Sequence, residues 1–301
     1  MRKNLLLAVA FVFVPLQVLF ANQYTLPTGG NDVIGDVRYQ PALSSDSVVT
    51  IAQQNNVGVN AVLNANPGLT EDQPLTNNEN VKIPGEFLLP PLPHNGIVIN
   101  LAEMRMYFYP GDGTVMTFPI GIGKVGKTIP MGGTRVTRKV VNPTWIPPED
   151  IRAFNRDKGI DLPHAMGPGP DNPLGPYAIY LKVPTYLIHS TIFPESIGRR
   201  ASFGCIRMHE SDIRQFFPLV KPGTPVAIVN MPAKVGWKGD RIYLETHPNL
   251  EEHPDPGISG IVDSIDRSMP EKGVTLVNWQ AVAYLSEQRD GIPHEIGIKV
   301  K

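Results

Sequence analysis

Short hydrophobic runs separated by turns fill the chain between residues 96 and 230 and predict β-strands. Runs at 97–99 and 104–109 flank a short turn and predict a hairpin. Further strands are expected at 115–121, 134–141, 177–181, 186–189 and 225–229. One helix is expected at 210–217. The pattern predicts a mainly β domain with short helices over residues 96–230.

The segments on either side of this domain have different patterns. Residues 44–86 are amphipathic, are closed by a short strand and predict a small α+β unit in the order strand, helix, helix, strand. A stiff proline-rich linker follows at 88–93. Residues 231–301 predict an extension docked on the main domain, with a strand at 241–245 and helices at 261–267 and 278–287.

Proline and glycine are concentrated between residues 143 and 176, which excludes one long helix there. The whole chain has 31 prolines in 301 residues, about twice the usual share of roughly 5%. Long ordered loops in a compact domain commonly form functional rims or lids. We therefore expect this stretch to border a functional site.

The first residues have the pattern of a secretory signal peptide over residues 1–21. Arg2 and Lys3 precede an apolar run, and Ala21 is a small residue at the expected cut. A retained membrane anchor is the alternative, but Pro15 and Gln17 interrupt the run, which is short for a membrane span. The pattern predicts an exported protein cleaved after Ala21.

The charge balance and the cysteine and histidine content exclude several kinds of partner and site. The 27 Lys and Arg residues balance 28 Asp and Glu residues, which argues against a nucleic-acid partner. Cys205 is the single cysteine, so no intramolecular disulfide can form. The seven histidines show no His-x-x-x-His or Cys-x-x-Cys spacing, so neither a metal site nor a cofactor is expected.

His189 and Cys205 are the candidate chemical pair. His189 ends an apolar strand, and Cys205 follows sixteen residues later, after a loop with Arg199 and Arg200. A histidine can take the thiol proton, and nearby arginines favour the thiolate, so we expect the pair to titrate below the pKa of free cysteine. Gly204 permits a tight turn with N–H groups beside the sulfur, as an acyl-transfer oxyanion requires. Taken alone, the pair is also compatible with two structural residues.

Residues 189–208 resemble the signature of the L,D-transpeptidase catalytic domain (YkuD type), in which a strand-borne histidine precedes a Ser-His-Gly-Cys-x-Arg segment. Upstream motifs agree in order: GIVIN at 96–100, AEMRMY at 102–107, PIGIG at 119–123 and GPGPDNPLG at 167–175. The likeness covers about residues 96–230 and is to periplasmic enzymes of Gram-negative bacteria that attach outer-membrane proteins to peptidoglycan. It implies a β-sandwich-like catalytic domain.

The resemblance implies roles for the residues around the pair. Cys205 is the nucleophile and His189 is the proton acceptor and donor, while Ser190 orients His189. The N–H groups of Gly204 and Cys205 hold the oxyanion.

Three other residues near the pair have less certain implied roles. Arg207 either forms a structural ion pair or binds a carboxylate, and Tyr177 lines the pocket or belongs to the core. Phe203 replaces a second histidine of the family pattern, which leaves that histidine's role open here, although phenylalanine can still pack against substrate.

The implied activity is acyl transfer on peptidoglycan tetrapeptide stems through a cysteine thioester, in cell-wall biosynthesis that maintains cell shape. The acceptor is a stem amine, giving a 3–3 crosslink, or an outer-membrane protein. Two alternatives are a non-catalytic peptidoglycan-binding protein and an L,D-carboxypeptidase, which is a hydrolase. Residues 44–86 resemble a LysM module through Asn66-Pro67-Gly68 and Ile83-Pro84. This implies glycan binding; the alternative is a structural appendage.

Overall fold

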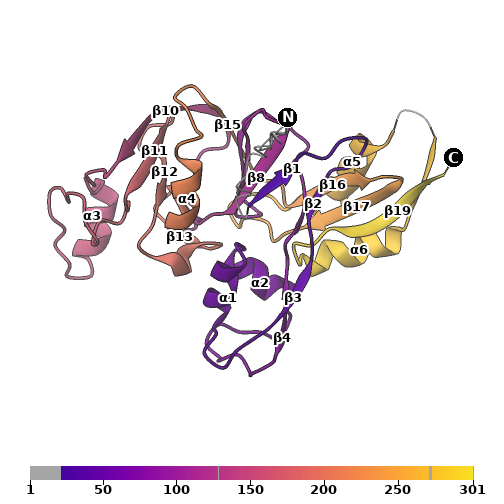
Figure 1. Cartoon of the computed structure of the whole chain (residues 1–301), viewed down its shortest axis with the longest axis horizontal. Coiled ribbons are helices and arrows are strands. Elements are labelled where there is room, and N and C mark those ends of the chain that lie inside the picture. The colour runs from indigo at the N-terminus through magenta and orange to yellow at the C-terminus, as the bar shows by residue number, and fades with distance from the viewer. Residues whose placement is uncertain (1–21, 128, 271–272, 301) are drawn as a thin grey trace, which may run out of the picture.

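The computed structural model describes residues 22–127, 129–270 and 273–300. The predicted signal peptide, residues 1–21, lies outside the described residues. Within them, no helix is both long and apolar enough to cross a membrane. Figure 1 shows a large curved sheet, a small helical unit below its centre, and a second sheet with two helices toward the C-terminus.

A nine-stranded sheet forms the predicted mainly β domain and takes one strand from the N-terminal segment. Neighbouring strands are antiparallel except for two parallel pairs, β6 with β15 and β12 with β14. The spatial order is β1 (Gln23–Thr25), β8 (Thr114–Pro119), β7 (Arg105–Tyr109), β6 (Gly96–Asn100), β15 (Pro225–Val229), β10 (Gly132–Val141), β11 (Tyr177–Leu181), β12 (Leu187–Ser190) and β14 (Ile206–Met208). The mainly β fold class is confirmed.

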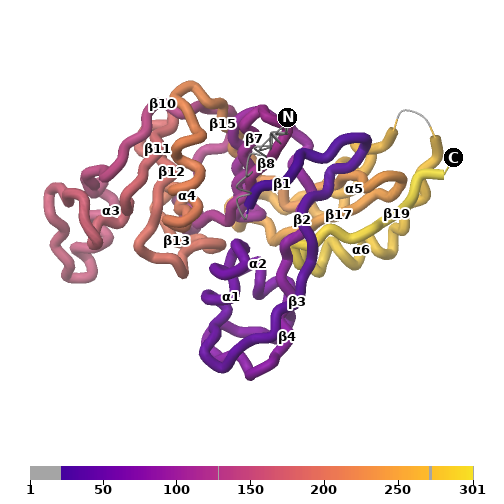
Figure 2. The backbone as a smooth tube through the Cα atoms, in the orientation of Figure 1, coloured from indigo at the N-terminus to yellow at the C-terminus, as the bar shows by residue number. Residues whose placement is uncertain are grey.

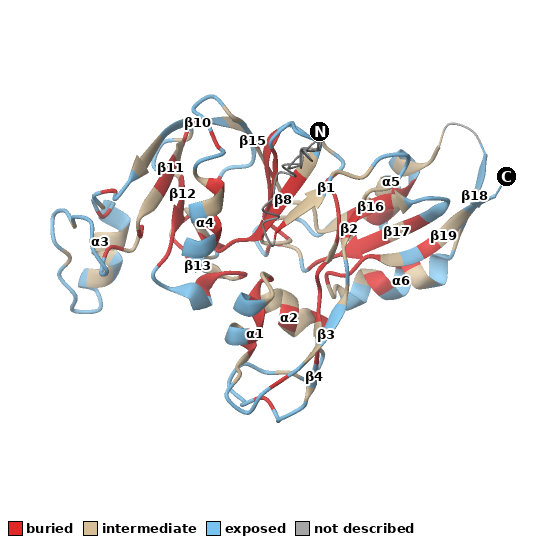
Figure 3. Ribbon diagram, in the orientation of Figure 1, coloured by how far each residue is buried: buried red, intermediate tan, exposed pale blue. Residues whose placement is uncertain are grey.

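Both faces of the central strands are covered, because alternate residues point into two cores. On β6, Ile97 and Ile99 join a core with helix α4 (Glu210–Phe216), whereas Val98 joins a core with the N-terminal helices. Every residue of β6 and β7 is buried. The neighbouring strand β8 is also mostly buried and is largely red in Figure 3. Burial on both faces explains why these strands are nearly continuous apolar runs in the sequence.

The N-terminal unit has the predicted order strand, helix, helix, strand: β3 (Arg38–Pro41), α1 (Val48–Gln54), α2 (Val59–Ala65) and β4 (Asn80–Ile83). Its first strand precedes residue 44 and pairs with β4. Two more short strands, β2 (Val33–Gly35) and β5 (Glu86–Leu88), pair with each other next to it. Ser47 starts α1 with a capping box, in which Ser47 and Thr50 each bond the other's backbone N–H. The LysM identity of this unit stays a prediction.

The N-terminal unit rests directly on the chain that leads to Cys205. The first N–H groups of α2, from Val59 and Asn60, donate to the carbonyls of Ile197 and Gly198 at 3.3 and 3.4 Å. Gly198 has φ +78°, and a Cβ there would lie 2.3 Å from the Cα of Gly58. The loop after the short helix η1 (Pro194–Ser196) and before strand β13 (Arg200–Ser202) therefore crosses α2 backbone to backbone.

The C-terminal extension is an α+β unit with a core of its own. Its sheet has the order β16 (Ala233–Lys238), β17 (Arg241–Thr246), β19 (His294–Val300) and β18 (Val274–Val277). Helices α5 (Gly257–Ser268) and α6 (Trp279–Gln288) pack on it. The predicted strand and both helices are present, but the sequence reading missed the other three strands. Figure 2 traces this unit as the orange-to-yellow end of the chain.

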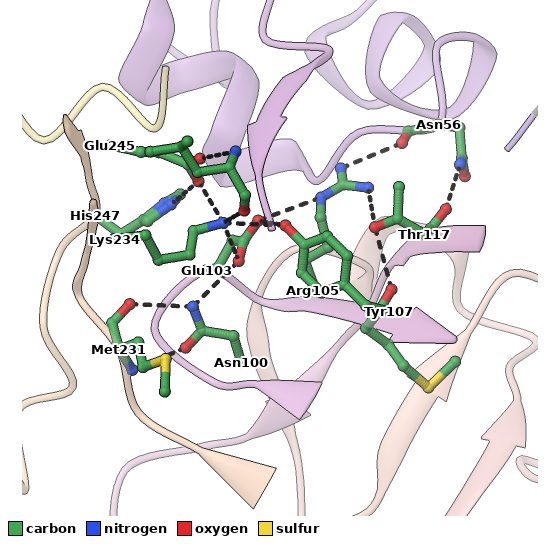
Figure 4. Close-up of polar contacts among 12 residues, drawn as sticks. Asn56, Asn100, Glu103, Arg105, Tyr107, Thr117, Met231, Lys234, Glu245 and His247 are labelled. Atoms are coloured by element: carbon green, nitrogen blue, oxygen red, sulfur yellow. Dashed lines mark hydrogen bonds and ion pairs between the residues drawn. The ribbon is translucent and has the colours of Figure 1, made fainter. Parts of the chain in front are cut away.

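A buried ion network joins the C-terminal unit to the large sheet (Figure 4). The ammonium group of Lys234 on β16 lies 2.9 Å from Glu103 Oε2 and 2.8 Å from Glu245 Oε1. It also donates to the Leu88 carbonyl at 2.6 Å and to the Tyr107 hydroxyl at 3.0 Å. Because none of the Lys234 side chain is exposed, its charge depends on these partners.

Candidate active site

The two candidate catalytic residues lie at two neighbouring parallel strands, one within a strand and one just before the other, at one end of the nine-stranded sheet. His189 is the third residue of β12, and Cys205 immediately precedes β14. The strands pair in register, with Ile188 opposite Ile206 and His189 opposite Arg207. The sixteen-residue separation seen in the sequence is therefore a loop that returns the chain to the adjacent strand.

Hydrogen bonding fixes the proton on the His189 ring. Nδ1 lies 2.5 Å from the backbone carbonyl oxygen of Ser190, and a carbonyl can only accept, so Nδ1 carries the hydrogen. Burial, with a smaller contribution from the Arg207 charge, lowers the pKa of His189 to about 4. The ring is therefore neutral near pH 7, and with the hydrogen on Nδ1 the basic lone pair is on Nε2.

The Ser190 hydroxyl is bonded to two backbone groups, at Leu174 and Tyr177. It donates to the Leu174 carbonyl at 2.9 Å and accepts from the Tyr177 N–H at 3.1 Å. This side chain holds β12 against the end of the Pro/Gly-rich segment, where a Cβ on Gly175 would come within 2.5 Å of the hydroxyl oxygen. The contact that orients His189 comes from the Ser190 backbone carbonyl, whereas the sequence reading assigned it to the residue as a triad-like partner.

Cys205 is half-buried, and its Sγ lies 3.7 Å from the Thr185 carbonyl, to which the thiol donates. Burial raises the pKa of Cys205, and a backbone hydrogen bond at Leu187 and the Arg207 charge oppose that effect. The direction is the reverse of the lowered pKa expected from the sequence. The resting pair is therefore a neutral thiol and a neutral imidazole.

The arginines expected to assist the thiol are engaged elsewhere. Arg199 forms an ion pair with Glu71 of the N-terminal unit, and Arg200 forms one with Glu252 at 2.5 Å. Arg207 takes the electrostatic role instead, since its charge acts on both Cys205 and His189. Its Nε is buried, with no hydrogen-bond partner within the described chain.

Ser202 organises the turn that carries Cys205, and it is not among the site residues predicted from the sequence. Its hydroxyl donates to the Cys205 carbonyl at 2.6 Å and accepts from the Gly204 N–H at 3.0 Å. Gly204 has φ +115°, in the region that favours glycine. Because its N–H is bonded to Ser202, the Cys205 N–H is the predicted oxyanion donor that remains.

Phe203 and the Pro/Gly-rich segment meet at the rim of the site. The Phe203 ring packs edge-on against Phe154 of helix α3 (Glu149–Arg156), with centroids 5.1 Å apart. The Lys124 ammonium lies between the rings, 3.7 Å from one centroid and 3.9 Å from the other. Lys127 and Asp150 add an ion pair at 2.7 Å. The segment is a rim, as expected, and it is anchored beside the nucleophile loop.

His189 and Cys205 open into a cavity of about 830 Å³. Residues 143–146, Pro148 and Leu174 form part of its wall. Its charged lining residues are three cations and one carboxylate: Lys127, Arg138, Arg207 and Asp150. Tyr177 does not line this cavity; its ring packs on Phe217 with centroids 5.0 Å apart. Tyr180 and Tyr186 line it instead.

One cluster in the described chain has metal-ligand residue types, and it lies outside the cavity. Donor atoms of Glu103, Glu245 and His247 lie within 4.8 Å of one another. Lys234 pairs with both carboxylates, and His247 Nε2 lies 2.6 Å from Glu245. The cluster belongs to the ion network that joins the two sheets.

The YkuD family profile, which describes the L,D-transpeptidase catalytic domain, matches residues 94–228. The Escherichia coli K12 protein named "Probable L,D-transpeptidase YcfS" is 37% identical over 92% of this chain and 88% of its own length. The chain belongs to the L,D-transpeptidase family. "Probable L,D-transpeptidase YbiS" of the same strain is 38% identical over 83% of each chain. The recognition from residues 189–208 is confirmed, and the protein is a transpeptidase.

Solved structures of L,D-transpeptidases are also similar to this chain. The solution structure of the E. faecium L,D-transpeptidase catalytic domain has 24% identity and a TM-score of 0.36, covering 46% of this chain and all of that one.

Proposed function

We propose that this transpeptidase acts in the periplasm on peptidoglycan tetrapeptide stems through a thioester on Cys205. The observation that carries the proposal is that His189 on β12 and Cys205, just before the paired strand β14, both line one cavity. A neutral thiol and an unprotonated imidazole nitrogen that line the same cavity are suited to proton transfer during attack.

The first half-reaction uses each group once. His189 Nε2 takes the thiol proton as Cys205 Sγ attacks the carbonyl of the third stem residue, meso-diaminopimelate. The Cys205 N–H is the proposed donor to the oxyanion, and Arg207 stabilises the negative charge on sulfur. When the intermediate collapses, the C–N bond breaks and His189 gives its proton to the departing D-alanine amine, leaving the thioester.

The second half-reaction transfers the acyl group to an acceptor amine. The amine attacks the thioester carbonyl and loses a proton to His189, and the proton then returns to the sulfur as the C–S bond breaks. A stem-peptide amine gives a 3–3 crosslink, and an amine of an outer-membrane protein gives an attached protein. Water in place of the amine would make the protein an L,D-carboxypeptidase.

The cavity and the neighbouring units support an anionic polymer as substrate. Lys127, Arg138 and Arg207 give the cavity wall a cationic excess over Asp150, which suits a stem peptide that carries several carboxylates. We propose that the N-terminal unit binds glycan, because a linked binding module raises the effective concentration of the stem at the site. We propose that the chain is exported by the signal peptide, which is then cleaved after Ala21.

Intact-mass analysis with a carbapenem tests the proposed chemistry, since the family resemblance implies acylation of the thiol by this class. We expect one covalent adduct on the exported protein, none on Cys205→Ala, and a rate lower by about 10²- to 10⁴-fold on His189→Gln. His164→Gln, an exposed histidine outside the cavity, is the control and should react as the native protein does. An adduct retained by Cys205→Ala would overturn the proposal.

A tetrapeptide muropeptide, incubated with and without an acceptor amine, separates the three activities. Acceptor-dependent product supports transpeptidation, whereas D-alanine release to water alone would show a carboxypeptidase. No turnover, together with binding to sacculi, would show a non-catalytic peptidoglycan-binding protein.

A further inference from the structure

A buried carboxylate lies beside the residue that export is proposed to make the first of the mature chain. Asp212, in the first turn of α4, is 4% exposed, and its Oδ1 accepts from the side-chain amide of Asn22 at 3.2 Å. Its other oxygen, Oδ2, has no hydrogen-bond partner within the described chain. An unpartnered buried carboxylate oxygen is costly, so this arrangement lacks a donor.

Asn22 is itself buried, with 4% exposure, although it directly follows the proposed cleavage point. Its carbonyl accepts from the Thr117 N–H on β8 at 3.0 Å, and Gln23 after it begins β1 on the sheet edge. The backbone of Asn22 is therefore held in place. Its backbone nitrogen is four covalent bonds from the amide that contacts Asp212, so the two nitrogens lie no more than about 5 Å apart.

No ion pair compensates the charge of Asp212 within the described chain. Burial raises its pKa to about 7, opposed by the Asn22 hydrogen bond and by Arg105 on β7. Arg105 is itself engaged with Glu103 at 3.9 Å and with the Thr117 hydroxyl at 3.3 Å. The site is suited to a further cation that comes from the Asn22 side.

We propose that the α-ammonium group created on Asn22 by signal-peptide cleavage forms an ion pair with Asp212. This inference rests on the proposed export. A signal peptidase adds water across the Ala21–Asn22 peptide bond, which leaves a carboxylate on Ala21 and an amine on Asn22. The pair joins β1 to α4, and α4 directly follows β14 and the nucleophile turn. The mature chain thereby gains an internal ion pair that the precursor cannot form.

The test moves the amine away from Asp212 without changing either residue. The full chain is exported, and its N-terminus is read by intact mass, with and without a Gly-Ser insertion between Ala21 and Asn22. We expect the insertion to lower Tm by roughly 5 °C, because it leaves a buried charge without its partner. The same insertion in Asp212→Asn should cost little. Glu210→Gln, which changes an exposed carboxylate on the same helix, is the matched control. In this background the insertion should lower Tm by as much as it does in the native chain.

Amine reactivity provides a second measurement that needs no Asp212 variant. Under mild reductive methylation, the native α-amine should react at least ten-fold more slowly than that of the inserted chain. Equal Tm losses in the native and Asp212→Asn backgrounds, equal labelling rates, or a mature chain that does not begin at Asn22 would each overturn the pair. Carbapenem adducts measured on the same samples report separately on the proposed function.

Discussion

His189 and Arg207 occupy paired positions on the parallel strands β12 and β14. Side chains at paired positions of adjacent strands lie on the same face, and Arg207 is also two residues from Cys205. One guanidinium therefore acts on both reacting groups: it lowers the pKa of His189 and opposes the rise in the pKa of Cys205 caused by burial. It favours the thiolate while keeping the base unprotonated.

Arg207→Met should slow the thiol by removing this charge. The pKa values of Cys205 and His189 should both rise, and alkylation by iodoacetamide at pH 7 should fall by roughly 10- to 100-fold. The acidic limb of the pH–rate profile reports protonation of His189, with a pKa of about 4 in the native protein, and should move to higher pH. Arg214→Met, an exposed arginine on α4, should leave both properties unchanged. An unaltered pH profile in Arg207→Met would show that this guanidinium does not act on the pair.

The strands and the reacting pair were predictable because their signals are local. Because both faces are buried, β6 and β7 appear in the sequence as apolar runs. The motif around Cys205 points to this residue as the proposed nucleophile. Strands β13 and β14 have three residues each, too few for a period, and they were missed. Strands β18 and β19 were also missed, because their exposed positions interrupt the apolar pattern.

The charge state of the site could not be predicted, because it depends on tertiary burial and distant partners. Arg199 and Arg200 look like thiol partners in sequence, yet Glu71, 128 positions away, and Glu252, 52 positions away, hold them. Desolvation of His189 and Cys205 likewise arises only when the sheet closes around them. A motif fixes the residue types, while the direction of each pKa shift follows from packing.

Gly204→Ala should damage the nucleophile turn through a specific collision. A Cβ there would lie 2.6 Å from Tyr186 Cε1 and 2.9 Å from the Lys127 carbonyl, at φ +115°. We expect a loss of about 1–3 kcal/mol in unfolding free energy and a larger proportional loss of acylation rate. Gly126→Ala is the matched control, because it has φ +75° on the same cavity wall but no atom within 4 Å of its Cβ. Equal effects of the two substitutions would assign the loss to backbone strain alone.

Phe203 and Phe154 should be energetically coupled, because their rings and Lys124 fasten the Pro/Gly-rich segment beside Cys205. In a double-mutant cycle, Phe203→Ala and Phe154→Ala should give a coupling energy of about 0.5–1.5 kcal/mol by chemical denaturation. Each single variant should also speed alkylation of the half-buried thiol by a bulky maleimide. Ile160→Ala, an exposed position of the same segment, should do neither. Strict additivity would show that the rings touch without holding the segment.

Lys234→Met should be among the most destabilising single substitutions outside the active site. It leaves the carboxylates of Glu103 and Glu245 buried without their shared cation, which costs about 3–5 kcal/mol. Lys238→Met on the same strand removes an ion pair with Glu86 in which the lysine is half exposed, and should cost about 0–1 kcal/mol. Urea denaturation of the two variants measures the contrast. Similar small losses in both would mean that the network adds no net stability at the junction.

The pH dependence of the stability of Lys234→Met gives a second, independent test of the ion network. Burial raises the pKa of Glu103, but Lys234, His247 and Arg105 outweigh it, so the net pKa is lowered in the native fold. A lowered carboxyl pKa contributes stability that is present above the unfolded value of roughly 4.3 and is lost as pH falls below it. Without Lys234, desolvation dominates and the folded pKa should rise above the unfolded one. The free energy of unfolding of Lys234→Met should therefore fall as pH increases from 4.5 to 7. In the native protein, the ionisation of Glu103 should cause no such fall over this range. A parallel pair of stability–pH curves would contradict this assignment of the Glu103 charge to Lys234.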